Sequence, residues 1–301
     1  MAPIDRRQAG FTLIEAIMAI VITGIVGGMV AVFIKNPVDA YTSAARRAAL
    51  TDAADTAVRR IGRDIRLALS NSVRNPVDGS DQCIEFIPTK TGGRYRVALT
   101  SASKGNILDF TAEDDAFDML WKNDDLPAAN RIAVGDVVVV YNDGFSGNAY
   151  GGTNAVKVES LDDGDEAKTT KIGFVNSATG TPFHRKRLPA ESPSFRFQVI
   201  PAAEHVVGYA CGGAAPNLVL TRYARTLSDT RAQPANCGDL IKDAGSSARL
   251  VDGLSVCSLK YDPPGSGTGA GRHGIVSMTL EVSRAGESVR LYHQVHVDNT
   301  P

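Results

Sequence analysis

Residues 6–28 read RRQAGFTLIEAIMAIVITGIVGG, and this stretch decides how the chain is organised. From Phe11 to Ile34 the single charged residue is Glu15. Twenty-four helical residues at about 1.5 Å each reach roughly 36 Å, which exceeds the roughly 30 Å hydrocarbon core of a bilayer. The sequence therefore predicts a membrane-spanning helix over residues 11–35, with one carboxylate inside it.

A secretory signal peptide is the main alternative, since it also begins with basic residues that precede an apolar run. Three features disfavour it: the apolar run is too long, it contains a carboxylate, and no Ala-x-Ala-like cleavage site follows. The positive-inside rule does not decide the orientation, because basic residues lie on both sides of the span: Arg6 and Arg7 before it, and Lys35, Arg46 and Arg47 after it.

The sequence Gly10-Phe11-Thr12-Leu13-Ile14-Glu15, placed between a short basic leader and a spanning helix, resembles the class III signal of type IV pilins and pseudopilins. The resemblance implies that a membrane aspartyl prepilin peptidase removes residues 1–10 on the cytoplasmic side. It also implies that cleavage falls between Gly10 and Phe11, and that the new amine of Phe11 is methylated. Further stretches, at residues 22–52, 211–225, 250–263 and 291–301, resemble larger minor pilins of the mannose-sensitive haemagglutinin (MSHA) type.

Glu15 needs an explanation, because a lone carboxylate at hydrocarbon depth costs several kcal/mol. The resemblance implies that it is a docking group, which pairs with the Phe11 amine of a neighbouring subunit during assembly. Two buried charges are each costly alone and tolerable as a pair. The other explanation, attraction to the N-terminal end of the helix dipole, provides only about 0.3–1 kcal/mol and does not offset burial.

The predicted helix continues beyond the membrane over residues 36–70, with a kink expected at Pro37. Apolar residues recur there at steps of three or four, which indicates a stripe that packs on a sheet: Leu50, Ala54, Val58, Ile61, Ile65 and Leu69. In the apolar half, Gly24, Gly27 and Gly28 would allow other helices to approach closely. The helix is expected to end near Asn71.

Residues 71–301 predict a mainly antiparallel β domain, which makes the chain an α+β protein of type IV pilin-like architecture. Period-two alternation favours strands at residues 83–87, 94–100, 136–142, 155–160, 194–200, 205–211, 217–223, 254–261, 274–283 and 288–297. The last two flank a short turn and are typical of a hairpin.

Four cysteines are present, and three pairings are possible: Cys83, Cys211, Cys237 and Cys257. The family resemblance places the domain in the periplasm, where disulfides persist. A Cys211–Cys237 bond, which would close an irregular Pro- and Gly-rich loop, is the preferred pairing, and Cys83–Cys257 would follow. Buried free thiols are the alternative.

No enzyme, cofactor or metal is expected from the sequence. His293 and His296 would lie on opposite faces of a strand. The acidic turn at residues 162–166 lacks the EF-hand pattern and is typical of a solvated turn, with calcium binding as the alternative. The basic run at 184–187 is typical of a solvated surface, with binding to DNA, glycan or lipid headgroups as the alternative. The glycine-rich stretch at 265–274 lacks the Lys-Ser/Thr end of a phosphate loop. A formal net charge of −1 argues against a nucleic-acid partner.

On these resemblances we interpret the chain as a minor pilin of an MSHA-type type IV pilus, active in assembly, in priming or at the tip. The alternatives are a minor pseudopilin of a type II secretion system and an adhesin module displayed at the tip. The expected partners are prepilin peptidase, other major and minor pilins, and inner-membrane lipid. The expected location is the inner membrane, crossed once with the C-terminal domain in the periplasm, and then the pilus at the cell surface.

Overall fold

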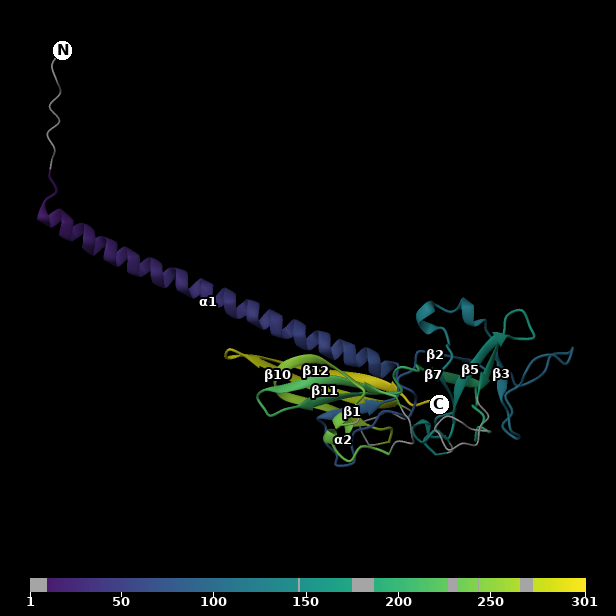
Figure 1. Cartoon of the computed structure of the whole chain (residues 1–301). Helices are drawn as coiled ribbons and strands as arrows, with labels where there is room; N and C mark the ends of the chain where they lie inside the picture. The colour runs from purple at the N-terminus through teal and green to yellow at the C-terminus, as the bar shows by residue number, and fades with distance from the viewer. Residues whose placement is uncertain (1–9, 146, 175–186, 227–231, 243, 266–272) are drawn as a thin grey trace, which may run out of the picture. The chain divides into compact units, whose positions relative to one another are not determined.

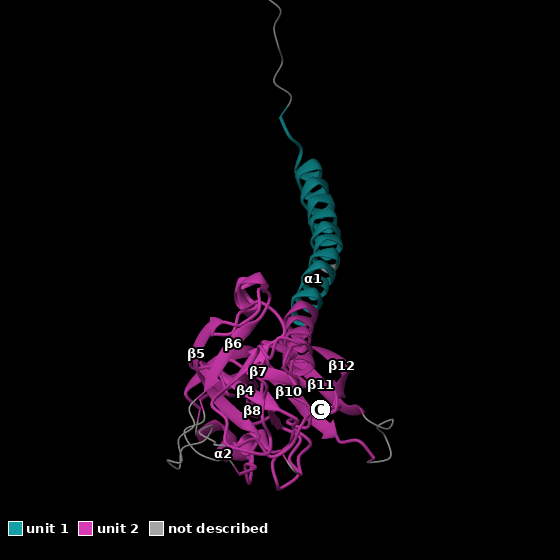
Figure 2. Cartoon of the chain, turned by 90° about the vertical axis from the view of Figure 1, so that its right-hand side faces the viewer, with its two compact units in different colours: residues 1–50 teal, residues 51–301 magenta. Residues whose placement is uncertain are grey.

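The computed structural model describes residues 10–145, 147–174, 187–226, 232–242, 244–265 and 273–301, except for the side chain of residue 36. It divides into two compact units, residues 1–50 and residues 51–301 (Figure 2). A long N-terminal apolar helix is followed by antiparallel β-sheets (Figure 1). The predicted class, α+β and pilin-like, is confirmed.

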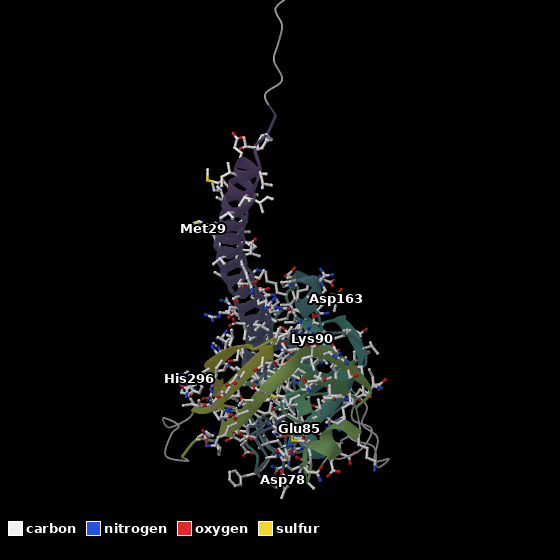
Figure 3. All side chains as sticks on the ribbon, turned by 90° about the vertical axis from the view of Figure 1, so that its left-hand side faces the viewer. Met29, Asp78, Glu85, Lys90, Asp163 and His296 are labelled. Atoms are coloured by element: carbon white, nitrogen blue, oxygen red, sulfur yellow. A yellow bond between two sulfur atoms is a disulfide. The ribbon has the colours of Figure 1, made fainter. Side chains whose placement is uncertain are left out.

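Helix α1 runs from Leu13 to Arg66 without a break at Pro37. The part in the first unit is long and apolar enough to cross a membrane, and its large apolar side chains are exposed. Met29, for example, is 68% exposed and projects from the helix (Figure 3). A helix that is apolar on all sides needs lipid or other helices around it.

The part of α1 in the second unit, residues 51–66, buries one face. Ala54, Val58, Ile61 and Ile65 are each at most 3% exposed, which confirms the predicted stripe there. The helix ends at Arg66, earlier than expected, and Leu69 beyond it is still buried. Asn71 then turns the chain with a φ of 59°.

Among the described residues the strands form two six-stranded antiparallel sheets. The first sheet has the order β1-β8-β9-β10-β11-β12, with bounds Cys83–Phe86, Val206–Gly212, Leu218–Arg225, Ser246–Asp262, His273–Arg284 and Glu287–Asp298. Residues 51–66 of α1 lie against this sheet: a Cβ on Gly62 would lie 3.3 Å from Val295 of β12. A short helix, α2 (Cys237–Lys242), contacts β1 and β8.

The second sheet has the order β2-β7-β4-β5-β6-β3, with bounds Thr91–Arg94, Arg196–Ile200, Val137–Val140, Ala155–Asp163, Thr170–Phe174 and Ala116–Met119. Three short 3-10 turns lie in the same region, at Asn123–Asp125, Ala128–Asn130 and Ala149–Gly151. Strand β4 is a run of four valines because it is buried on both faces. Val138 and Val140 pack into the core of the second sheet, while Val137 and Val139 pack with Leu69 and with Val206 of the first sheet.

Two expectations about the strands were wrong. The strand predicted at 94–100 ends at Arg94. Beyond it the backbone turns to residues 118–119, where the Arg96 N–H donates to the Asp118 carbonyl at 2.9 Å and the Arg96 side chain pairs with Asp118 at 3.1 Å. Strands β3 and β6 were not predicted at all. β3 reads Ala-Phe-Asp-Met and is buried at all four positions, so its sequence shows no alternation.

Candidate functional site

The processing and assembly residues lie at the start of α1. Gly10, Phe11 and Thr12 precede the helix and are exposed, and the Phe11 side chain is 79% exposed. A Cβ placed on Gly10 would meet nothing within 4 Å. The described part of the chain therefore does not itself require a glycine there.

Thr12 and Glu15 form a reciprocal cap at the helix N-terminus. The Glu15 Oε2 accepts hydrogen bonds from the Thr12 backbone N–H at 3.2 Å and from the Thr12 hydroxyl at 3.1 Å. The Glu15 N–H donates to the Thr12 Oγ1 at 3.3 Å. This is the capping box, Ser/Thr-x-x-Glu, in which each side chain satisfies a backbone donor that the helix leaves free.

The capping box changes the interpretation of Glu15. The carboxylate has a local partner in addition to the helix dipole, and the Thr-x-x-Glu spacing is the signal for it in the sequence. Within the described residues both side-chain hydrogen bonds use Oε2 and leave Oε1 open. The box therefore holds the carboxylate in place while one oxygen stays able to accept from a cation.

Three glycines follow Glu15 after about two and a half to three and a half helical turns, at Gly24, Gly27 and Gly28. A Cβ at any of the three would meet nothing within 4 Å. A glycine in a helix interior costs about 0.5–1 kcal/mol relative to alanine. Because nothing else in the described chain requires them, these glycines are suited to close approach by another helix.

Comparison with protein families supports this site. Residues 5–31 match the model of the prokaryotic N-terminal methylation motif. The chain carries a prepilin signal. The match supports a protein of the type IV pilin family, and with the apolar helix it indicates membrane anchoring. No curated protein and no solved structure is significantly similar to the chain.

A polar network attaches α1 to the first sheet within the second unit. Asp64 Oδ2 accepts from the Tyr209 hydroxyl at 2.6 Å and from Arg222 Nε at 3.1 Å. Arg222 also forms a two-pronged pair with Glu204, at 3.0 and 2.7 Å. Burial, and then the bond to Asp64, raises the pKa of Tyr209, while the hydrogen bond from Arg222 lowers the pKa of Glu204. The network fixes the helix by charge-assisted bonds as well as by packing.

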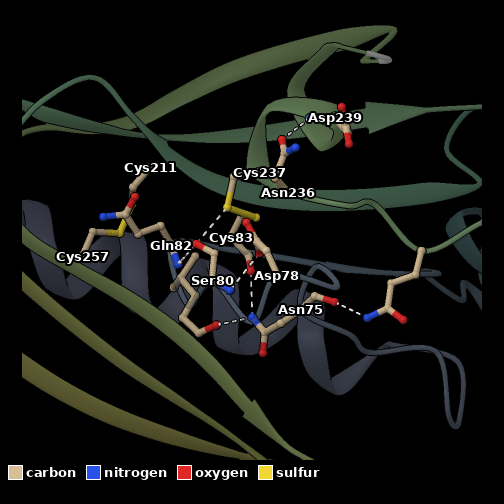
Figure 4. The surroundings of a disulfide bond; sticks show 12 residues. Asn75, Asp78, Ser80, Gln82, Cys83, Cys211, Asn236, Cys237, Asp239 and Cys257 are labelled. Atoms are coloured by element: carbon tan, nitrogen blue, oxygen red, sulfur yellow. Dashed lines mark hydrogen bonds between the residues drawn. A yellow bond between two sulfur atoms is a disulfide. The ribbon is translucent and has the colours of Figure 1, made fainter.

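The disulfides differ from the predicted pairing. Cys83 is bonded to Cys237, with Cα atoms 5.6 Å apart, and Cys211 is bonded to Cys257, with Cα atoms 6.4 Å apart (Figure 4). The predicted pairs Cys211–Cys237 and Cys83–Cys257 are wrong.

Strand register explains the error. Cys83 lies directly opposite Ala210, so the next residue, Cys211, points to the other face of the sheet. Cys83 packs with Cys237 and Leu240 of α2 on one face. Cys211 lies on the same face as Tyr209, which contacts α1, and there it meets Cys257. Cys237 therefore cannot reach Cys211 through the sheet.

The described residues also show where the other candidate residues lie. His293 and His296 lie on the regular ladder of β12 and point to opposite faces, as predicted; His296 is exposed (Figure 3). In the acidic segment, Asp162 and Asp163 belong to β5, and Glu166 pairs with Arg96. No group of metal-ligating side chains occurs in the part of the chain that the structure describes. Of the basic run, residues 184–186 lie outside the described residues, and Arg187 donates to the Thr111 carbonyl at 3.3 Å.

Proposed function

We propose that the chain is a minor pilin of an MSHA-type type IV pilus, held in the inner membrane as a prepilin, with its β domain in the periplasm, and assembled after prepilin-peptidase cleavage. The observation that carries this proposal is the juxtaposition of the prepilin signal, the capped Glu15 and an exposed apolar helix. The assignment to an MSHA-type pilus in particular rests on the resemblance of residues 211–225, 250–263 and 291–301 to the MSHA minor pilin MshO.

The proposed assembly step follows from the geometry at the helix start. Cleavage between Gly10 and Phe11 would create an amine next to a carboxylate that Thr12 already holds in place. Oε1 of Glu15 would accept from the corresponding amine of a neighbouring subunit, and Gly24, Gly27 and Gly28 would let the two helices pack closely. The roles of Gly10, Phe11 and Glu15 are those of the resembled family. The role proposed for the β domain is structural, not enzymatic.

A minor pseudopilin of a type II secretion system shares the same signal and is the second candidate. Deletion in the native host separates the two: loss of surface pili supports the pilus, whereas loss of secreted enzymes with pili intact supports secretion. Intact mass of the cellular protein should show removal of residues 1–10 and addition of one methyl group. Isolation of the mature protein with other minor pilins would support the priming or tip position.

A further inference from the structure

A cationic cavity opens on the second sheet, entirely within residues 51–301. It measures about 620 Å³ and lies beside β2, β7 and the end of α1. Its charged lining side chains are those of Arg66, Arg94, Arg196 and Asp298, three cationic and one anionic, in a chain whose formal net charge is −1. The Asp298 carboxylate forms a local hydrogen bond, in which its Oδ1 accepts from the Thr300 N–H at 2.9 Å.

Two of these arginines oppose each other across the sheet. Arg94 of β2 is the direct antiparallel partner of Arg196 of β7, so their side chains leave the same face. Both are exposed, and neither forms an ion pair with another residue in the described ranges. Like charges directly opposite on neighbouring strands destabilise a sheet. An anion bound between them would convert this repulsion into attraction.

The sheet leaves room for such an anion. The next pair on the same face is Gly92 with Gln198, and Gly92 has no side chain to fill the space. On the other face, Phe197 and Val199 pack into the core and hold the cavity floor in place. A Cβ on Gly92 would lie 2.8 Å from the Phe197 carbonyl oxygen, so the backbones are as close as glycine allows.

The opposite wall is held by hydrogen bonds between segments far apart in sequence. Ser70 Oγ donates to the Thr300 carbonyl at 2.8 Å, and the Asn71 N–H donates to Asn299 Oδ1 at 3.0 Å. Asn142 Nδ2 donates to the Ser70 carbonyl at 2.6 Å. The wall is therefore preorganised, which lowers the entropic cost of binding.

Unusual backbone conformations also gather here. Asn71, Tyr141 and Phe195 have φ values of 59°, 52° and 55°. Tyr141 lines the cavity, and the other two adjoin lining residues Ser70, Ser194 and Arg196. Non-glycine residues with positive φ cost free energy and cluster at ligand sites.

We propose that this arginine cavity binds an acidic saccharide, with the carboxylate or sulfate of one sugar held by Arg94 and Arg196. Guanidinium groups bind such oxyanions through two parallel hydrogen bonds. The volume is in the range of small-ligand pockets, and the remaining lining offers hydroxyl and amide groups suited to sugar hydroxyls: Thr89, Ser194 and Gln198. The half-buried Tyr141 provides an aromatic surface. A protein partner would favour a cluster of apolar anchors, whereas this lining carries three arginines among hydroxyl and amide groups.

Binding is measured by calorimetry with the full chain in detergent micelles. The probes are trigalacturonate (carboxylated), a heparin tetrasaccharide (sulfated), maltotriose (neutral) and a 12-nucleotide single-stranded DNA. We expect one or both acidic saccharides to bind, with affinity falling as salt rises, and maltotriose not to bind. Comparing the two acidic probes identifies the preferred anion.

Arg196→Gln should weaken the binding of the acidic saccharide at least about tenfold, because it removes a charge-assisted contact. Arg196→Lys, which keeps the charge without the planar fork, should lose less. The matched control is Arg290→Gln, an exposed strand arginine opposite Glu281 that lies outside the cavity, and its affinity should equal that of the wild type. Thermal unfolding confirms that each variant is folded. Three outcomes would overturn the proposal: no binding of either acidic saccharide, a loss of affinity in Arg290→Gln equal to that in Arg196→Gln, or binding of DNA alone.

Discussion

Asp64→Asn tests whether the polar network holds helix α1 to the first sheet. The Asp64 carboxylate accepts two hydrogen bonds, at 2.6 Å from Tyr209 and at 3.1 Å from Arg222, and its side chain is only 23% exposed. A hydrogen bond to a charged group contributes about 1.5–3 kcal/mol, and asparagine keeps the shape and one acceptor. We therefore expect a loss of about 2–3 kcal/mol in the free energy of unfolding.

For a domain of this size that loss corresponds to a Tm lower by about 5–10 °C. The assay is thermal unfolding of the purified full chain, followed by circular dichroism. Asp55→Asn is the matched control: it makes the same substitution on the same helix, in an exposed pair with Arg59 at 2.6 Å. An exposed pair of this kind contributes about 0.3–0.5 kcal/mol, so its Tm should fall by no more than about 2 °C. Equal shifts in the two variants would refute the argument that burial makes the Asp64 bonds strong.

Three further predictions concern the disulfides, pH and helix packing. Non-reducing peptide mapping should recover a Cys83–Cys237 linkage, and replacing both cysteines by alanine should cost about 2–5 kcal/mol; a different pairing would contradict the strand register. Because Arg222 lowers the pKa of Glu204, the Glu204–Arg222 pair stabilises the fold above the unfolded pKa of 4.5, and this stabilisation is lost as pH falls through the folded pKa. Glu204→Gln should therefore flatten the dependence of the unfolding free energy on pH below about pH 5, by less than about 1 kcal/mol. An unchanged pH dependence would refute this. Gly27→Leu should leave the Tm of the β domain unchanged but reduce co-isolation with other pilins, and wild-type co-isolation would exclude close helix packing at that position.

The regular spacing of apolar residues along each element made the main elements predictable. The apolar stripe from Ala54 to Ile65 and the alternation in β11 and β12 both follow from burial on one face, which the sequence records directly. Strands β3 and β6 were not predicted because they are short. In addition, β3 is buried on both faces and contains an aspartate, Asp118, that pairs with Arg96.

The site was predictable to the extent that its chemistry is local. Gly10, Phe11 and Glu15 belong to one contiguous motif of six residues, and the capping box forms between Thr12 and Glu15 of that motif. The disulfide pairing and the opposition of Arg94 and Arg196 depend on which residues face each other across strands. Register is a property of the folded sheet, so neither could be deduced from spacing along the chain.

The central claim is that the Glu15 carboxylate docks one subunit on the next. Glu15→Gln tests it most directly, because glutamine can still complete the capping box with Thr12 and so preserves the helix start. Glu15→Ala serves as the control that removes the cap and the charge together. Surface pili and co-isolated partner pilins should be counted in native-host strains that carry each variant as the chromosomal copy.

We expect both variants to be inserted and cleaved before Phe11, and both to fail in assembly, because the amine of the neighbouring subunit would be left buried without its counter-charge. Failure of Glu15→Ala alone would assign the residue to the helix cap and contradict docking by charge. Wild-type piliation in the Glu15→Gln strain, with Phe11 as the mature N-terminus, would show that the carboxylate is not the docking group.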